Sequence, residues 1–120
     1  MVKIERRGAP RAADKDLAMK LRLGEVDAAI HTLNISASGA YCKTDKEIPL
    51  MSRVKLIIML PDTEKPGSPE RRIEVTGVVV REHPVLVDGK IKHYDLAIFF
   101  EDISAKDREV LSAYVSKKAV

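Results

Sequence analysis

Hydrophobic and polar residues alternate with a period of two along most of this chain, as they do in half-buried β-strands. The alternation predicts a first strand over residues 16–23 and, after a Gly-Glu turn, a second over 26–35. A short third strand is expected over 40–42, and a nearly continuous apolar run predicts a fourth over 54–60. The segment PDTEKPGSPE, residues 61–70, contains three prolines and a glycine and predicts an exposed loop.

The second half of the chain predicts a long hairpin. Residues 73–79 alternate as a strand, and Gly77 within it fits a bend where a small sheet curls into a barrel. The segment 85–92, VLVDGKIK, predicts a type I′ turn at its central Asp-Gly pair. Pro84 is expected to mark a bulge or an edge position. The returning strand places every second residue from 94 to 100 on one apolar face.

The last fifteen residues of the predicted fold change to a helical period. Ser104 is placed to cap a helix, and an apolar stripe at helical spacing follows it, formed by Val110, Leu111, Tyr114 and Val115. We therefore predict an all-β fold, a six-stranded antiparallel β-barrel with a C-terminal α-helix. The expected division is a flexible basic arm over 1–15, the barrel over 16–103 and the helix over 104–118, all within one domain.

Length and composition narrow the protein class. A chain of 120 residues with 45% hydrophobic and 32% charged residues suits one globular domain. No apolar run approaches the roughly 20 residues needed to span a bilayer, and the N-terminus lacks the apolar stretch of a secretory signal. The single cysteine, Cys42, cannot form an internal disulfide and is expected as a small buried strand residue. These features predict a cytoplasmic protein without membrane insertion.

Charge is distributed unevenly, and catalytic motifs are missing from the sequence. Residues 1–11 contain four basic residues and one acidic residue, whereas the other 109 contain 17 of each. The whole positive excess therefore falls on the N-terminal arm, where it is suited to binding an anion.

His31, His83 and His93 have no partners at metal-ligand spacing, and no nucleophile elbow or phosphate-binding loop occurs. We expect no enzyme activity, no metal and no cofactor.

Two short strings are candidates for ligand binding. In RRGAPR, residues 6–11, Arg7 and Arg11 flank a Gly-Ala-Pro kink that favours an extended loop, and guanidinium groups bind phosphate and stack on rings. In NISASG, residues 34–39, strand periodicity places Asn34 and Ser36 on one face, with Leu33 and Ile35 toward the core. Gly39 fits a close backbone approach or a positive φ. Each string alone is better explained as a solvated tail or a polar turn.

Together and in this order, the two strings resemble the PilZ domain, whose signature is RxxxR followed by [D/N]xSxxG. Arg7 and Arg11 match the first motif, Arg6 matches an extra arginine found in many members, and Asn34, Ser36 and Gly39 match the second. The strings "RVKLIIMLP", "VTGVVVR" and "YDLAIFFEDIS" extend the similarity over nearly the whole chain.

The resemblance implies binding of the bacterial second messenger cyclic di-GMP. Arg7 and Arg11 would hold phosphates and guanines, and Asn34 and Ser36 would contact a guanine edge. Asn34 stands where aspartate is commoner, which gives up a charge-assisted acceptor. Arg81, expected on the Gly77 face of its strand, is an additional candidate contact, with a solvated arginine as the alternative.

The predicted function is thus a non-catalytic cyclic di-GMP receptor that changes conformation on binding and signals to a protein partner, with a motility, exopolysaccharide or biofilm-type output. One alternative is a small-barrel nucleic-acid binder, which the low aromatic content of 4% disfavours. The other is a ligand-free adaptor of the same fold that acts only through protein contacts.

Overall fold

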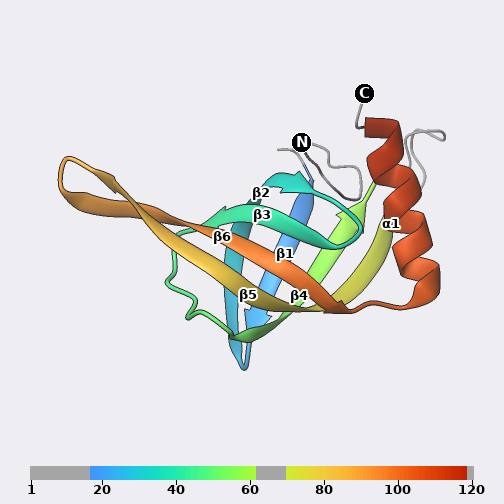
Figure 1. Ribbon diagram of the computed structural model, residues 1–120, viewed down its shortest axis with the longest axis horizontal. Coiled ribbons are helices and arrows are strands. Elements are labelled where there is room, and N and C mark those ends of the chain that lie inside the picture. The colour runs from blue at the N-terminus through green and yellow to red at the C-terminus, as the bar shows by residue number, and fades with distance from the viewer. Residues whose placement is uncertain (1–16, 62–69, 119–120) are drawn as a thin grey trace, which may run out of the picture.

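The computed structural model describes residues 17–61 and 70–118. Six antiparallel strands close into a barrel in the order β1-β2-β3-β6-β5-β4, and one helix follows them (Figure 1). The elements are β1 (Ala18–Leu23), β2 (Val26–Ile35), β3 (Gly39–Thr44), β4 (Arg53–Leu60), β5 (Arg71–Val87), β6 (Lys90–Asp102) and α1 (Ala105–Lys118). The predicted fold class is confirmed.

The barrel interior is filled by the alternating apolar residues that predicted the strands. The largest fully buried side chains come from every strand except β3 and from the helix, namely Phe100, Leu21, Ile35, Leu56, Ile58, Ile73, Leu96, Leu111, Val54, Val75, Val79 and Val115. Burial of such side chains contributes roughly 1.5–3 kcal/mol each before the entropy of ordering the chain is subtracted. This single core holds the strands in register and so positions the outer face.

The β5–β6 hairpin is longer than the barrel and extends away from it (Figure 1). Its turn has positive φ at Asp88 (53°) and Gly89 (79°), which confirms the type I′ turn. Pro84 pairs with Tyr94 inside the ladder, and the nearest register shift follows it, between Val85 and Leu86. The extra residue of this shift is Lys92 on β6, so the bulge lies in the partner strand and Pro84 itself keeps regular pairing.

Helix α1 packs against the barrel on the side away from the hairpin tip (Figure 1). Leu111, Tyr114 and Val115 are buried in the core cluster, as the helical stripe predicted. The backbone N–H of Asp107 donates to Ser104 Oγ at 3.1 Å, so the predicted N-cap is confirmed. Arg71 on β5 also donates to Asp107 at 3.2 Å, which fixes the start of the helix against the sheet.

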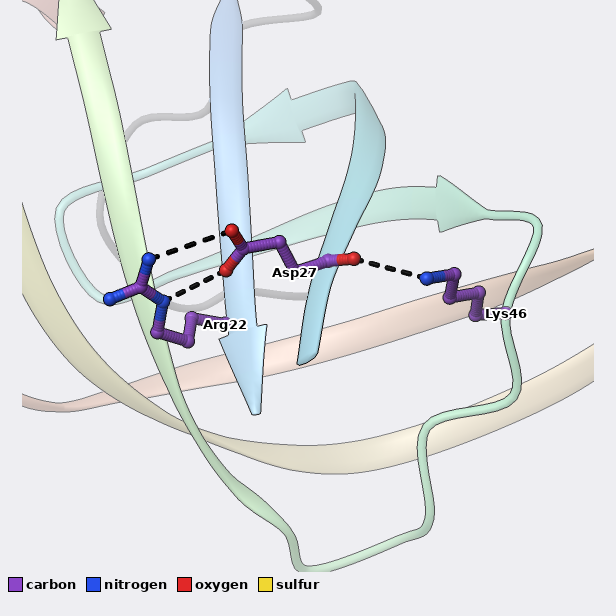
Figure 2. Close-up of polar contacts among 3 residues, drawn as sticks. All are labelled: Arg22, Asp27 and Lys46. Atoms are coloured by element: carbon purple, nitrogen blue, oxygen red, sulfur yellow. Dashed lines mark hydrogen bonds and ion pairs between the residues drawn. The ribbon is translucent and has the colours of Figure 1, made fainter. Parts of the chain in front are cut away.

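The β1–β2 hairpin ends in an exposed polar cluster, which Figure 2 shows. Arg22 Nε donates to Asp27 Oδ1 at 2.8 Å, and Lys46 Nζ donates to the backbone carbonyl of Asp27 at 3.1 Å. The Arg22 guanidinium lowers the pKa of the Asp27 carboxyl. The resulting stabilisation is present above the unfolded-state pKa of Asp27 and is lost as the pH falls. Because both groups are exposed, solvent screening keeps this contribution small.

Candidate functional site

Asn34 and Arg81 lie at the two ends of one row that crosses four neighbouring strands. Asn34 on β2 pairs with Tyr41 on β3, and Tyr41 pairs with Ala97 on β6. Ala97 in turn pairs with Arg81 on β5. Because adjacent strands lie about 4.8 Å apart, three steps separate the ends of the row by roughly 14 Å along the sheet.

This row faces outward, because the row beside it forms the core. The neighbouring row contains only buried residues, namely Ile35, Ala40, Ile98 and Val79. Side chains alternate between the two faces of a strand, so the row from Asn34 to Arg81 points to the outside. Tyr41 is 37% exposed, which agrees with this orientation. The outer face of β2, β3, β6 and β5 therefore presents an amide, a phenol and a guanidinium in line.

A β-bulge places each end of the row on the outer face. In β2 the pairing register shifts between Thr32 and Asn34, so that Leu33 is the extra residue. Thr32 is buried, and without the shift strict alternation would turn Asn34 inward as well. The expectation that Leu33 points into the core is wrong for this reason, because Leu33 is only half-buried and Thr32 takes the inward position.

The second bulge lies in β5 between Val79 and Arg81, with Val80 as the extra residue. Strict alternation put Arg81 on the face of Gly77, and this expectation is wrong. Gly77 and Val79 face the core, whereas the bulge turns Arg81 to the outside together with Asn34. Two irregularities in separate strands thus bring a candidate amide and a candidate guanidinium to the same surface.

Ser36 is not on the face of Asn34, in contrast to the expectation from strand periodicity. Strand β2 ends at Ile35, and Ser36 is fully buried in the turn that leads to β3. Its hydroxyl accepts a hydrogen bond from Ser38 N at 3.2 Å and donates to the Gly39 carbonyl at 3.3 Å. The backbone N–H of Ser36 also donates to Gly39 O at 2.9 Å. Ser36 therefore stabilises the turn that connects Asn34 to Gly39.

Gly39 is required for close packing of two strands. A Cβ at this position would lie 2.6 Å from the carbonyl oxygen of Ile98 on β6. Its φ is not in the positive region, so the turn geometry makes no demand for glycine. Of the two explanations drawn from the sequence, a close backbone approach is correct, and the approaching backbone is that of β6. The glycine of the second string thus allows β3 and β6 to pack closely beside the row.

Next to the row, the outer face is hollowed. A shallow depression of about 540 Å³ is lined by Tyr41, Leu50, Val80, Arg81, Glu82, His83, Asp95, Leu96 and Ala97. Tyr41 and Ala97 were not singled out from the sequence. Tyr41 could have been found, because it lies two residues after Gly39 on the same strand face. Ala97 could not, because its position depends on strand register.

The remaining His, Cys, Asp and Glu side chains form no metal-binding group in the described part of the chain. Burial raises the pKa of the Cys42 thiol to about 12, with the nearby Asp95 charge as a smaller cause. The expectation of a small buried strand residue at Cys42 is confirmed. Within residues 17–61 and 70–118, no three His, Cys, Asp or Glu side chains gather as a metal-binding group. No helix in these ranges is long and apolar enough to cross a bilayer.

The arginines of the first string, Arg6, Arg7 and Arg11, lie outside the described residues. The structure consequently describes Asn34, Ser36, Gly39 and Arg81 of the seven candidate positions. It brings Asn34 and Arg81 to one surface, gives Ser36 a buried position in the turn that follows Asn34, and places Gly39 where β3 and β6 pack closely.

Comparison with known proteins identifies the family. The family model described as the PilZ domain matches residues 5–117, nearly the whole chain. The chain belongs to the PilZ domain family. PilZ domains are non-catalytic modules associated with cyclic di-GMP binding, and the match includes both strings, from RRGAPR to NISASG. A search of curated proteins found no match.

A solved structure supports the fold of this PilZ domain independently. The chain is similar to the solved structure of the Bacillus subtilis inhibitor of motility MotI/DgrA, with a TM-score of 0.78 and 24% sequence identity. The match covers 95% of this chain and 51% of that protein, so the chain spans about half of its length. At this level of identity the similarity shows a shared barrel architecture.

Proposed function

We propose that this PilZ domain is a non-catalytic receptor for cyclic di-GMP that transmits ligand binding to a protein partner. The observation that supports the proposal most directly is the row from Asn34 to Arg81 on the outer face. It extends the second string of the family signature into a surface that offers hydrogen-bonding and cationic groups in line. Cyclic di-GMP presents two phosphates and two guanines, which are the groups that such side chains bind.

Each part of the proposed site has a separate task. The Asn34 amide offers a donor and an acceptor to a guanine edge, and the turn held by Ser36 fixes the backbone that follows Asn34. Arg81 offers a guanidinium at the other end of the row for a phosphate or for stacking on a base. Arg7 and Arg11 supply the remaining cationic groups, and Arg6 adds a third. Their contribution rests on the match to the family signature.

The proposed signal to the partner depends on where these arginines lie in the sequence. They precede β1, so their engagement with the ligand would change the surface that the beginning of the chain presents. A partner protein that distinguishes the two surfaces completes the proposed mechanism. The similar Bacillus subtilis protein is an inhibitor of motility, and control of motility is accordingly one output that we include in the proposal.

Isothermal titration calorimetry with cyclic di-GMP tests the receptor function directly. We expect saturable heat at neutral pH and moderate salt, and no comparable heat with GMP. The molar ratio fitted to the titration gives the number of ligands bound per chain. Absence of heat with cyclic di-GMP would contradict the proposal. Binding to oligonucleotides that weakens steeply with salt, without preference for the cyclic dinucleotide, would instead support a nucleic-acid-binding barrel.

A further inference from the structure

An exposed apolar turn projects beside the hollow on the outer face. The turn Pro49–Ser52 belongs to the connection between β3 and β4, and it presents Leu50 (56% exposed) and Met51 (72% exposed) to solvent. It is attached to β5, because Met51 N donates to the Val79 carbonyl at 2.7 Å and Val79 N donates to Ser52 O at 3.0 Å. This apolar projection is therefore held in a defined place.

The backbone of this turn is strained at its most exposed residue. Met51 has a φ of 66°, in the left-handed region that favours glycine and asparagine. A methionine there costs stability, and its side chain is not buried in exchange. Such strain, where it is observed, is a reason to look for a function of the side chain.

Further exposed apolar side chains lie on the same outer face. Val80, the extra residue of the β5 bulge, is 47% exposed and lines the hollow together with Leu50. Phe99, two residues along β6 from Ala97, is 52% exposed on the same face. We call Tyr41, Leu50, Met51, Val80 and Phe99 the apolar face. From their exposed fractions, these five side chains present roughly 500 Å² of surface, within the range of patches that are often functional on monomers.

We propose that the apolar face is the contact between two copies of this chain, related by a two-fold axis. A two-fold contact needs a surface that is complementary to itself. The apolar face has a projection at Met51 and a hollow of about 540 Å³ directly beside it, so each copy inserts its Met51 into the hollow of the other. The shape alone thus satisfies the requirement.

Charge and area agree with a second copy as the occupant. Side chains of both charge signs line the hollow, namely Arg81, Glu82 and Asp95. A two-fold axis can therefore place the guanidinium of one copy opposite a carboxylate of the other. Standard interfaces bury about 800 Å² per partner, and homodimer contacts are about 65% apolar. An apolar centre of roughly 500 Å² with this charged border fits that size.

Sedimentation equilibrium over low micromolar to millimolar protein, without any nucleotide, tests the contact. We expect a reversible monomer–dimer equilibrium. Met51→Asn should weaken dimerisation at least about tenfold, because it removes the inserted side chain. The same change should raise the melting temperature by about 3 °C, because asparagine tolerates the left-handed backbone better. Weaker dimerisation together with a higher melting temperature would show that the Met51 side chain serves the contact between copies and not the stability of the monomer.

Leu50→Ser serves as a second variant within the face, and Leu86→Ser serves as the matched control. Leu86 is 60% exposed near the tip of the β5–β6 hairpin, outside the apolar face, and its replacement should leave the dimer unchanged. A chain that stays monomeric at the highest concentration, or a dimer that Met51→Asn and Leu50→Ser both leave intact, would overturn the proposal. Because no nucleotide is present, the result is independent of whether the chain binds cyclic di-GMP.

Discussion

Asn34 and Arg81 are 47 positions apart in the sequence and occupy the same outward row of the barrel, joined through Tyr41 and Ala97. Each reaches this row through a bulge in its own strand. Bulges often re-aim side chains next to binding sites. The relationship makes Arg81 a specific candidate for ligand contact and leads to the first prediction.

Replacement of Arg81 by alanine should weaken cyclic di-GMP binding by about tenfold or more, because a charge-assisted hydrogen bond is lost. The side chain is exposed, so the melting temperature should stay within about 2 °C of the wild type. Calorimetry and thermal unfolding measure the two effects. Arg53→Ala is the control, because Arg53 is also an exposed strand arginine, but it pairs with Glu101 and lies on β4, which β5 and β6 separate from β3. Equal loss in both variants would mean that only general charge matters.

Asn34→Asp should bind cyclic di-GMP at least as tightly as the wild type, whereas Asn34→Ala should bind about tenfold more weakly. Aspartate restores the charge-assisted acceptor that is commoner at this position of the family signature, and alanine removes both hydrogen-bonding groups. Titration calorimetry on both variants gives the comparison. If alanine binds as well as asparagine, the side chain at position 34 makes no contact with the ligand.

Arg11→Ala should lose most of the binding and leave the melting curve unchanged. The prediction rests on the RxxxR string, in which Arg7 and Arg11 supply guanidinium groups for phosphate. Lys3→Ala, which removes one positive charge from the same segment, is the matched control and should change the affinity only slightly. A large fall in melting temperature for Arg11→Ala would instead assign this arginine a structural role.

Gly39→Ala should destabilise the barrel by about 1–3 kcal/mol, because the added Cβ would meet the Ile98 carbonyl and force β3 and β6 apart. Urea unfolding measures the free energy of unfolding. Gly24→Ala is an informative comparison, since a Cβ there meets nothing within 4 Å and only its positive φ of 61° opposes the substitution. Gly39→Ala that loses ligand affinity at wild-type stability would show that the ligand, rather than β6, approaches this glycine.

The Cys42 thiol should resist Ellman's reagent at about pH 8 in the folded protein and react rapidly after unfolding in guanidinium. Burial raises its pKa from the ordinary 9.0 to about 12, so the reactive thiolate is scarce. The neutral thiol contributes stability that is fully present below pH 9.0 and is lost as the pH rises toward 12. Rapid modification of the folded protein would show that the strands around Cys42 open locally.

The sequence by itself determined the strands, the Asp-Gly turn, the capped helix and the identity of the family. These features depend on local preference and on the period of apolar residues, both of which can be read from neighbouring positions. The buried stripe at Leu111, Tyr114 and Val115 followed in the same way from helical spacing.

Only the tertiary structure decided which side chains share a surface. A bulge adds one residue to a strand and reverses the face of those that follow, and a period-two pattern contains no signal for where it occurs. Strict alternation therefore puts Arg81 on the wrong face, and it puts Ser36 beside Asn34 although Ser36 is buried in the turn that follows Ile35. The closeness of Gly39 to Ile98 likewise depends on the register between β3 and β6, which arises when the barrel closes.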